Sequence, residues 1–349
     1  MGAVSGTAVR TGQGLPPTHP EGIVVAIDGG GTKTDAVALD ATGAVVAHVR
    51  LGASDVHPGR EGESAAVVDA AVRRVHAEAG GGPLLRVGVF LSGLDHEDEF
   101  AAFRARIRSL PWFLGEDGVE AHVENDMFAL LRTGTLAPDA VAVVCGTGLN
   151  AIGVRADGTT ARFLAWGAVS GDWGGGSDIG AEALRLAARA LDGRGPETAL
   201  TTALPESFGR SDLTALIEDV HFGRLPEERL AELVPVVFTA ADRGDAVSRA
   251  LVERQAEEIV AMAASAARRL GLDRDPIPVV LGGGVLAARQ PLLLDGVVQR
   301  LAAALPSAVP TVVDARPVVG AGLALLEQQG SADDVLRRAR AALERTVPA

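Results

Sequence analysis

The clearest pattern near the start of the chain is a pair of short apolar runs separated by a polar, glycine-rich turn. Ile23–Ile27 and Ala36–Leu39 contain only Val, Ile, Ala and Leu, whereas the segment between them, Asp28–Asp35, includes three consecutive glycines. Short apolar runs bounded by turn residues are typical of buried strands. Because the second run also has strand character, the pattern predicts a β-hairpin and not a turn that opens a helix.

Strands and helices are then predicted to alternate. Three further apolar segments have strand character, and three segments have apolar residues at helical spacing. In chain order these segments are 44–50, 62–79, 85–91, 97–110, 119–123 and 127–132. Their order indicates a mixed sheet covered by helices. The succession of strand, Gly/Thr turn and strand begins again within 140–156, so the chain contains an internal repeat.

The second half of the chain is predicted to be mainly helical, with two more strands. The expected helices are 179–191, 196–219, 226–270, 291–305, 319–328 and 332–345, and the expected strands are 278–281 and 311–313. The repeat and the length of 349 residues predict two α/β domains. We expect them at 21–133 and 134–349, with the last helix packing back on the first domain, and a disordered tail at 1–20.

Composition changes this picture mainly by exclusion. The chain is acidic, with a formal net charge of −13 and no block of Lys and Arg, which argues against nucleic acid or an anionic membrane as a partner. No segment reaches about 18 apolar residues without charge, so no membrane span is expected. Residues 1–20 lack the pattern of a signal peptide, and we expect a cytoplasmic protein.

Cysteine and histidine give no sign of a metal centre. The single cysteine, Cys145, lies in an apolar run and is expected to be a small buried side chain. The 7 histidines are scattered without an H-x-x-x-H pair. A zinc site is therefore not expected.

Three predicted strands end in glycine runs, and these runs are the strongest candidates for ligand binding. They are Gly29–Gly31, Gly146–Gly148 and Gly282–Gly284, and threonines accompany the first two. Strand ends of this kind are where α/β sheets bind ligands, and clustered backbone N–H groups suit phosphates. We interpret the runs as a nucleotide site to which each domain contributes one phosphate turn, with the third run leaving room for the nucleoside.

Two charged residues of the first turn fit the same ligand. Asp28 ends the predicted strand, and its carboxylate suits Mg²⁺. Lys33 is the only lysine of the chain, although an incidental lysine in a glycine-rich hairpin is the alternative. The turn is neither a Walker A loop nor a G-x-G-x-x-G turn that opens a helix.

Two other segments place carboxylates in informative positions. Asp126 ends a predicted strand and precedes a helix, where it could take a proton from an attacking hydroxyl or act as the helix N-cap. The segment Trp166–Asp178 combines Trp, Gly and Asp, as carbohydrate sites do, although a glycine-rich hinge has the same composition. Both pairs of alternatives stay open on this pattern alone.

Taken in order, these motifs resemble those of the actin/Hsp70/hexokinase superfamily of ATPases, and more narrowly the BadF/BadG/BcrA/BcrD-type ATPase family with its N-acetylglucosamine kinase-like branch. The similar segments are Asp28–Thr34, Cys145–Asn150, Trp166–Gly174, Leu281–Val285 and Pro317–Ala321. The resemblance implies an α/β, two-domain, ribonuclease H-like fold with an interdomain active-site cleft. It also implies ATP and Mg²⁺ as cofactors and a small-molecule amino sugar as substrate, and it leaves open whether the protein is a homodimer.

The resemblance further implies roles for residues at matching positions. Asp126 would be the catalytic base, and Asp28 would act through metal-bound water. The residues implied to contact ATP are Gly30, Gly31, Thr32, Lys33, Thr34, Gly146, Thr147, Gly148, Gly282, Gly283 and Gly284. The residues implied to line the sugar pocket are Asp55, Ser92, Gly93, Asn125, Asp126, Asn150, Trp166, Gly167, Asp172 and Asp178.

The chain departs from the family pattern at three positions near the expected sugar. Asp55 stands where the family usually has Asn, Trp173 replaces a Glu, and Asp178 replaces an aromatic residue. A carboxylate suits a cationic 2-ammonium group, and a charge-assisted hydrogen bond contributes about 1.5–3 kcal/mol. We therefore expect a kinase for the 6-hydroxyl of glucosamine, resembling a high-GC, actinobacterial-type branch. N-acetylglucosamine is the alternative substrate.

Two interpretations from other classes have less support. A dehydratase activator on the same fold needs cysteines for an iron–sulfur cluster, and Cys145 stands alone. A non-catalytic sugar or nucleotide-binding regulator has no need of a base such as Asp126. The sequence also shows no N-terminal helix-turn-helix pattern.

Overall fold

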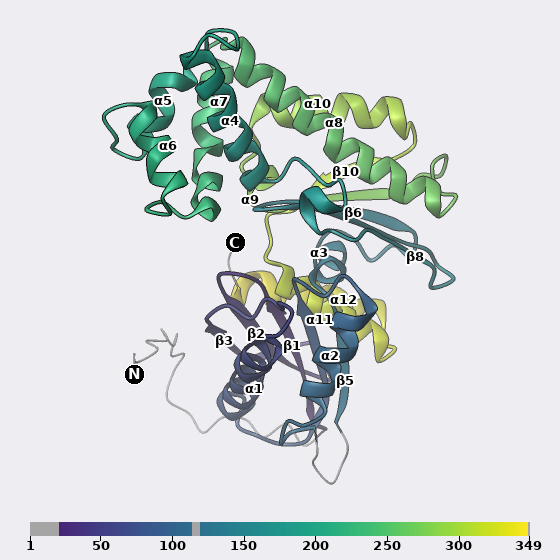
Figure 1. Cartoon of the computed structure of the whole chain (residues 1–349). Coiled ribbons are helices and arrows are strands. Elements are labelled where there is room, and N and C mark those ends of the chain that lie inside the picture. The colour runs from purple at the N-terminus through teal and green to yellow at the C-terminus, as the bar shows by residue number, and fades with distance from the viewer. Residues whose placement is uncertain (1–20, 114–118, 348–349) are drawn as a thin grey trace. The chain divides into compact units, whose positions relative to one another are not determined.

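The computed structural model describes residues 21–113 and 119–347 (Figure 1), so the tail predicted at 1–20 lies outside the described residues. The chain forms two compact units. Unit 1 consists of the described residues up to Leu136 and of those from Asp314 onward, and unit 2 is Ala137–Val313. The sequence assigned all of 134–349 to the second domain and expected only the last helix to return. That assignment is wrong for the segment from Asp314 onward.

Unit 1 is built on a five-stranded sheet with the order β3-β2-β1-β4-β5. Strand β1 pairs antiparallel with β2, and β2 pairs antiparallel with β3, whereas β4 runs parallel to β1 and β5 parallel to β4. The predicted hairpin is therefore confirmed. The strands are β1 Ile23–Gly29, β2 Thr34–Asp40, β3 Val45–Leu51, β4 Leu84–Leu91 and β5 Glu120–Asn125.

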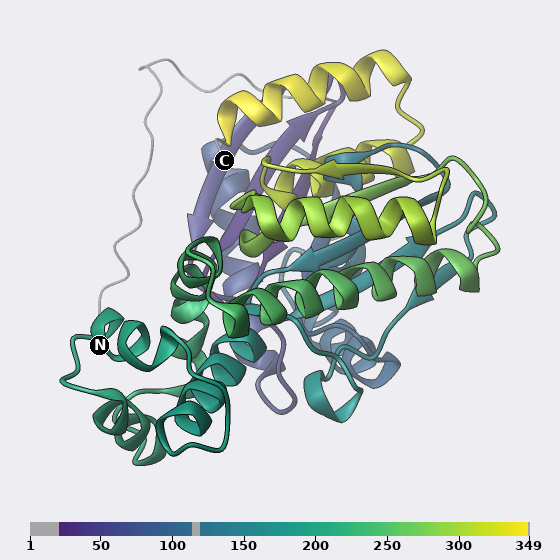
Figure 2. The ribbon, with the colours of Figure 1, turned by 90° about the horizontal axis from the view of Figure 1, so that it is seen from above.

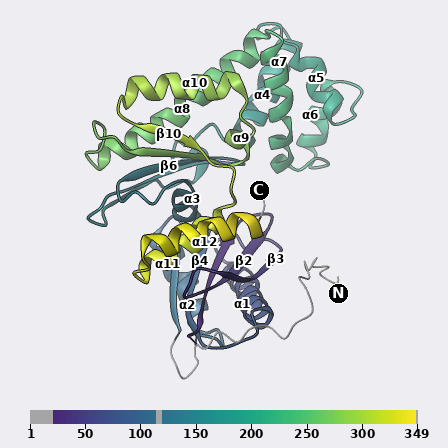
Figure 3. The same cartoon turned by 180° about the vertical axis from the view of Figure 1, so that it is seen from behind.

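The side chains of β1 alternate between two layers of helices. Ile23 and Val25 belong to a buried cluster with α1 and α2, whereas Val24 and Ala26 belong to a cluster with α11 and α12. Successive side chains of a strand point to opposite faces, so burial on both faces explains the uninterrupted apolar run. The helices of unit 1 are α1 Glu61–Glu78, α2 Glu97–Ile107, α3 Asp126–Gly134, α11 Pro317–Gln328 and α12 Asp333–Thr346 (Figure 3).

Helix α11 packs on α3 with a very close approach of the two backbones. A Cβ atom at Gly320 would lie 1.9 Å from the carbonyl oxygen of Ala129. The Gly320 N–H donates to the Thr133 hydroxyl at 3.1 Å, and Arg340 of α12 donates to backbone carbonyls at the end of α3. The segment Pro317–Ala321 thus begins α11, and the chain that returns to unit 1 fixes the position of α3.

Unit 2 repeats the sheet arrangement of unit 1. Its order is β10-β9-β6-β7-β8, with an antiparallel pair on one side of β6 and parallel strands on the other. Strand β6 therefore corresponds to β1, and the internal repeat predicted from the sequence is confirmed. The strands are β6 Ala140–Cys145, β7 Leu149–Val154, β8 Thr160–Arg162, β9 Pro278–Gly282 and β10 Val309–Val312.

The helical part of unit 2 is more divided than the sequence predicted. The continuous helices expected over 196–219 and 226–270 are wrong, because Gly209 and Gly244 adopt positive φ and end helical segments. Helices α8 and α10 lie side by side (Figure 1, Figure 2). Among the described residues, no helix combines the length and apolar character needed to cross a membrane. The helical elements are η1 Gly167–Val169, α4 Gly176–Leu191, α5 Leu200–Ser207, α6 Leu213–His221, η2 Glu227–Leu233, α7 Val234–Asp242, α8 Ala246–Arg269, α9 Gly284–Ala287 and α10 Pro291–Ala304.

We expect Gly320→Ala to lower the free energy of unfolding by about 3 kcal/mol, because the added methyl group overlaps the Ala129 carbonyl and separates α11 from α3. Urea unfolding followed by circular dichroism measures the effect. Gly62→Ala is the matched control, since a Cβ there meets nothing within 4 Å and α1 can accept alanine. Equal midpoints for the two variants would contradict the close packing of α11 on α3.

Candidate functional site

The first glycine turn, at the carboxyl end of β1, is fixed by the loops that follow β3 and β4. The Ser54 N–H donates to the Gly30 carbonyl and the Ser92 N–H donates to the Gly29 carbonyl, both at 3.1 Å. A Cβ at Gly29 would lie 2.0 Å from Ser54 Oγ, so the loop after β3 can pack here only against glycine. The tip of the turn, Gly31–Thr32, is exposed and accessible to a ligand.

Thr34 supports this turn from inside the fold. Its side chain is fully buried. Its hydroxyl donates to the Gly52 carbonyl at 2.6 Å and lies 2.7 Å from Ser54 Oγ. The structure therefore gives Thr34 a positioning role, in place of the direct phosphate contact that the sequence predicted.

Lys33 and Arg316 bring positive charge to the same turn. Burial, and after it the neighbouring Arg316 guanidinium, lowers the pKa of the Lys33 ammonium group. Burial raises the pKa of Asp28, and the two cations oppose this rise. Arg316 was missed at the sequence level, because only the return of the chain to unit 1 brings it beside Lys33.

Two carboxylates, Asp28 at the end of β1 and Asp126 after β5, dominate the electrostatics of unit 1. Burial raises the pKa of Asp28 well above its usual range, and the neighbouring Asp126 carboxylate raises it further. Burial also raises the pKa of Asp126 to about 6, although backbone N–H groups at the start of α3 oppose this. Poorly hydrated carboxylates that repel each other favour uptake of a proton or a cation.

The N-cap of α3 is Asn125, so the alternative in which Asp126 serves as the N-cap is wrong. Asn125 Oδ1 accepts the Met127 N–H at 2.9 Å, and Asn125 Nδ2 donates to the Leu94 carbonyl and to Asp95 Oδ1 at 3.1 and 3.0 Å. Asn125 is only 3% exposed. It therefore ties the start of α3 to the loop after β4, and Asp126 occupies the first turn of the helix.

The predicted sugar residues Ser92, Gly93 and Asp55 come together in unit 1. Gly93 has a φ of +80°, and a Cβ there would lie 2.0 Å from the Val56 carbonyl oxygen. The Val56 N–H donates to the Ser92 carbonyl at 2.9 Å. These contacts hold the loop of Asp55 against the loop of Ser92 and Gly93.

Asp55 lines a polar cavity of about 370 Å³ that extends from the tip of the first turn to α1. Asp55 Oδ2 lies 2.5 Å from His57 Nε2, and Arg60 pairs with Glu63 at 2.6 Å. His57, Arg60 and Glu63 were missed, because no motif distinguishes them from ordinary surface polar residues. The lining residues are Gly31, Ala53, Asp55, His57, Arg60, Glu63, Ser64 and Val67.

In unit 2 the second and third glycine runs meet at the end of β6. A Cβ at Gly283, whose φ is +89°, would lie 2.4 Å from the Cys145 carbonyl oxygen, and one at Gly146 would lie 3.8 Å from the Gly284 nitrogen. Gly148 is exposed, and a Cβ there would meet nothing within 4 Å. The structure thus brings together the two runs that the sequence predicted to bind a nucleotide, and it leaves open space at the tip of the second.

The second turn also presents backbone donors. Within the part of the chain that the structure describes, no group accepts a hydrogen bond from the N–H of Thr147 or of Gly148. Both residues are exposed. Two adjacent N–H groups without protein acceptors are suited to phosphate oxygens.

The segment that resembles a sugar motif forms a tight local turn around η1. Trp166 N–H donates to Ser170 Oγ at 2.8 Å, Ser170 Oγ donates to Asp172 Oδ2 at 2.5 Å, and Asp172 N–H donates to the Gly167 carbonyl at 3.0 Å. Trp166 is 46% exposed. The close internal hydrogen bonding argues against a flexible hinge.

Asp178 and Asn150 are engaged by their own surroundings. Asp178 Oδ2 accepts the N–H groups of Gly174 and Gly175, both at 3.1 Å, at the start of α4. Asn150 Oδ1 accepts the Ala151 N–H at 2.7 Å. The structure therefore explains Asp178 as a residue that orders the glycine run before α4, and a sugar contact for it stays a prediction.

The carboxylates of unit 1 fit a magnesium ion that is held together with substrate phosphates. No group of three or more His, Cys, Asp or Glu side chains within the described residues could hold a metal alone. Mg²⁺ commonly uses one or two carboxylates together with phosphate oxygens and water. Burial, and after it the Asp126 carboxylate, raises the pKa of Asp28, and a cation beside these two carboxylates would oppose their repulsion.

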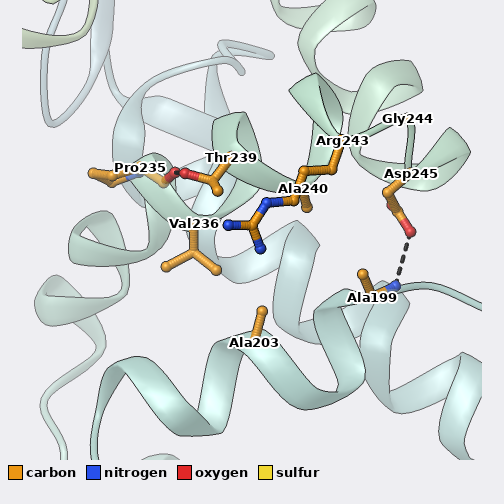
Figure 4. A pocket seen from close by; sticks show the side chains of 9 residues that line it. All are labelled: Ala199, Ala203, Pro235, Val236, Thr239, Ala240, Arg243, Gly244 and Asp245. Atoms are coloured by element: carbon orange, nitrogen blue, oxygen red, sulfur yellow. Dashed lines mark hydrogen bonds between the residues drawn. The ribbon is translucent and has the colours of Figure 1, made fainter.

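A cavity of about 520 Å³ in the helical part of unit 2 carries none of the predicted residues (Figure 4). Its lining is largely apolar, and the Arg243 guanidinium extends over Val236 and Ala203 (Figure 4). Its described lining contains no glycine run. Its carboxylate, Asp245, already accepts the N–H groups of Ala199 and Ser248. The strand ends, and not this cavity, are therefore the candidate active site.

The chain is similar to a known family and to curated proteins along most of its length. The family model described as BadF/BadG/BcrA/BcrD ATPase matches residues 25–324. An N-acetyl-D-glucosamine kinase of Dictyostelium discoideum is 28% identical over 319 residues, which are 88% of this chain and 98% of that protein. An N-acetylmuramic acid/N-acetylglucosamine kinase of Clostridium acetobutylicum is 26% identical over 75% of this chain and 85% of its own length.

Solved structures show the same fold. A Chromobacterium violaceum protein, described as a proposed N-acetylglucosamine kinase, superposes with a TM-score of 0.67 and 25% identity, covering 87% of this chain and 98% of that one. A ROK family glucokinase from Streptomyces griseus, solved with glucose and AMPPNP, superposes with a TM-score of 0.53 and 17% identity. The match covers 88% of this chain and 100% of that one. The two-domain, hexokinase-like α/β fold predicted from the sequence is confirmed.

We expect Asp126→Asn to raise the free energy of unfolding at pH 7.5 by about 1–2 kcal/mol. The folded pKa of Asp126, about 6, lies above its usual value of 3.8. The protonated carboxyl therefore stabilises the fold below about pH 4, and that contribution is lost as the pH rises through 6. The advantage of Asn should accordingly disappear at pH 4, as measured by urea unfolding at both pH values.

The matched control for this prediction is Asp275→Asn, an exposed loop position that should change stability little at either pH. A loss of stability in Asp126→Asn at pH 7.5 would mean that the helix N-terminus outweighs the burial of the carboxylate.

Proposed function

The chain belongs to the BadF/BadG/BcrA/BcrD ATPase family, and on that premise we propose that it transfers the γ-phosphate of ATP to the 6-hydroxyl of an amino sugar. Glucosamine is the proposed preferred substrate. The observation that carries the proposal is Asp126, a poorly hydrated carboxylate with a pKa of about 6 at the start of α3. The names of the matched relatives, which are amino-sugar kinases, support the substrate class.

Asp126 would act as the general base. A carboxylate with a pKa near 6 is mostly ionised at neutral pH and yet more basic than an ordinary aspartate, which favours proton transfer from a hydroxyl. It would orient the sugar 6-hydroxyl and accept its proton as the hydroxyl oxygen attacks the γ-phosphorus in line. The bond between the γ-phosphorus and the bridging oxygen breaks, and ADP leaves.

The glycine runs would bind ATP, and the positive side chains of unit 1 would attract its negatively charged phosphates. Thr147 and Gly148 would donate backbone N–H groups to phosphate oxygens. Lys33 would add positive charge at the first turn. Asp28 would bind Mg²⁺, which when present neutralises charge on the β- and γ-phosphates.

Two groups of residues that the sequence identified would suit a sugar, and each lies within one unit. In unit 1, Ser92, Gly93 and Asp55 belong to two loops that hydrogen bond to each other. In unit 2, the exposed indole of Trp166 offers an apolar face, and Asp172 offers a carboxylate next to it.

The preference for glucosamine rests on Asp55 alone, because Asp178 already accepts two backbone N–H groups. The Asp55 carboxylate lines an open polar cavity and would attract a 2-ammonium group. His57 beside it can also donate a hydrogen bond, and together the two side chains suit a neutral acetamide. N-acetylglucosamine is therefore the second candidate substrate, and the names of the matched relatives favour it.

A coupled assay of ADP release over glucosamine, N-acetylglucosamine, glucose and mannosamine tests the proposed activity. We expect Asp126→Asn to lower kcat by about 100-fold or more while sugar binding stays within about threefold, because only proton transfer is lost. Isothermal calorimetry with the sugar checks binding, and Asp275→Asn is the control. Sugar binding without ADP release in the wild-type protein would instead support a regulator.

Asp55→Asn tests the charge argument for glucosamine. We expect kcat/KM for glucosamine to fall about 10-fold and that for N-acetylglucosamine to change less than about threefold, because only the ammonium group loses an ionic partner. Glu63→Gln is the matched control, since Glu63 lines the same cavity but is paired with Arg60. Equal losses for both sugars would overturn the preference for glucosamine.

A further inference from the structure

We infer that Gln255, on α8, is a positioning residue for ATP, because it fixes the glycine segment on which the second phosphate turn rests. The inference depends on the proposed binding of ATP at Gly146–Gly148. It assigns a role in the nucleotide site to a helix that contributes no residue to the motifs recognised in the sequence.

The side chain of Gln255 is completely buried, with 0% exposure. Its Nε2 donates to the Gly174 carbonyl at 2.7 Å and lies 3.5 Å from Cys145 Sγ. The Cys145 thiol donates to the same Gly174 carbonyl at 3.3 Å. Gln255 Oε1 is buried without a hydrogen-bond partner within the described residues. Burial of an amide oxygen without a partner lowers the stability of the fold. The hydrogen bond from Nε2 to the Gly174 carbonyl opposes this cost and explains why a polar side chain occupies the position.

The carbonyl that Gln255 holds belongs to the segment Gly174–Ser177, which packs directly on the second turn. The Gly176 N–H donates to the Gly146 carbonyl at 2.8 Å, and the Ser177 N–H donates to the Thr147 carbonyl at 3.0 Å. A Cβ at Gly175 would lie 2.4 Å from Gly148 Cα. The segment thus binds the carbonyl side of the turn.

The carbonyl of Gly146 and the N–H of Thr147 belong to one peptide group, and the carbonyl of Thr147 and the N–H of Gly148 belong to the next. Hydrogen bonds to the two carbonyls therefore fix the direction of the two N–H groups. The N–H groups of Thr147 and Gly148 are without protein acceptors in the described chain and remain available to phosphate. Any shift of Gly174–Ser177 would change the direction of these donors. The affinity for phosphate is therefore coupled to the hydrogen bond of Gln255.

Helix α8 holds the same segment at a second point. The Arg254 guanidinium lies 3.7 Å from the ring centroid of Trp173, the residue just before Gly174. The positive charge over the face of the indole is a favourable cation–π contact. Two consecutive residues of α8, Arg254 and Gln255, thus hold two consecutive residues, Trp173 and Gly174. This explains Trp173, which replaces the glutamate of the family pattern, as part of the support for the turn.

The test is Gln255→Met, which keeps the length of the side chain and removes the N–H donor. We expect KM for ATP and the Kd for ADP to rise about 5- to 15-fold, the range that loss of one buried hydrogen bond predicts. KM for the sugar and kcat at saturating ATP should stay within about twofold. Gln299→Met is the matched control, because Gln299 is an exposed glutamine of α10 in the same unit.

A second variant guards against loss of folding in Gln255→Met. Arg254→Ala changes only an exposed side chain, and it should raise KM for ATP about two- to fivefold with the sugar KM unchanged. A fall in thermal stability without a change in KM for ATP, in either variant, would overturn the inference and leave a purely structural role.

The two proposals fail in different ways. If the wild-type protein phosphorylates no sugar, the proposed function fails, and calorimetric titration of ADP still tests Gln255. If the wild-type protein is an active kinase and Gln255→Met binds ADP normally, only the role of Gln255 fails. An equal rise in KM for ATP and for the sugar would also count against it.

Discussion

The structure depends on places where a neighbouring loop lies closer to a glycine than a Cβ atom would allow. Gly29 packs against Ser54, Gly93 against the Val56 carbonyl, and Gly175 against Gly148. Each contact joins a loop at the carboxyl end of a strand to a neighbouring loop of the same unit. Only glycine fits at these positions. Hydrogen bonds of the main chain hold the glycine turns that we propose to bind phosphate. An anion site of this kind needs few basic side chains, which is consistent with an acidic protein.

A second constraint is the poor hydration of Asp28 and Asp126. Burial raises the pKa of both carboxylates, so the folded protein is less stable at neutral pH than it would be with neutral side chains. The same burial makes Asp126 a stronger base. Helix α3, which begins with Asp126, is in turn fixed by Gly320 of α11 and Arg340 of α12. The C-terminal segment thus contributes to the site although it supplies no predicted catalytic residue.

The hydrogen-bond partners of Asp55 and Asp178 distinguish the two carboxylates as candidates for sugar recognition. Asp55 and Asp178 were equivalent in the sequence, as carboxylates gained relative to the family pattern. In the structure Asp178 accepts the N–H groups of Gly174 and Gly175, whereas Asp55 lines a polar cavity beside His57. Asp178 therefore orders the glycine run before α4, and Asp55 remains the candidate for recognition of the 2-substituent of the sugar.

The sequence by itself determined the hairpins, the repeated strand order, the three glycine runs and the family, because apolar periodicity and turn residues report local conformation and burial. It did not determine that the chain from Asp314 onward belongs to unit 1, nor the breaks at Gly209 and Gly244. It also missed Gln255, which meets Gly174 across 81 positions of the chain. Hydrogen-bond partners so distant in sequence leave no periodic signal, and only tertiary packing decides which polar side chain meets which carbonyl.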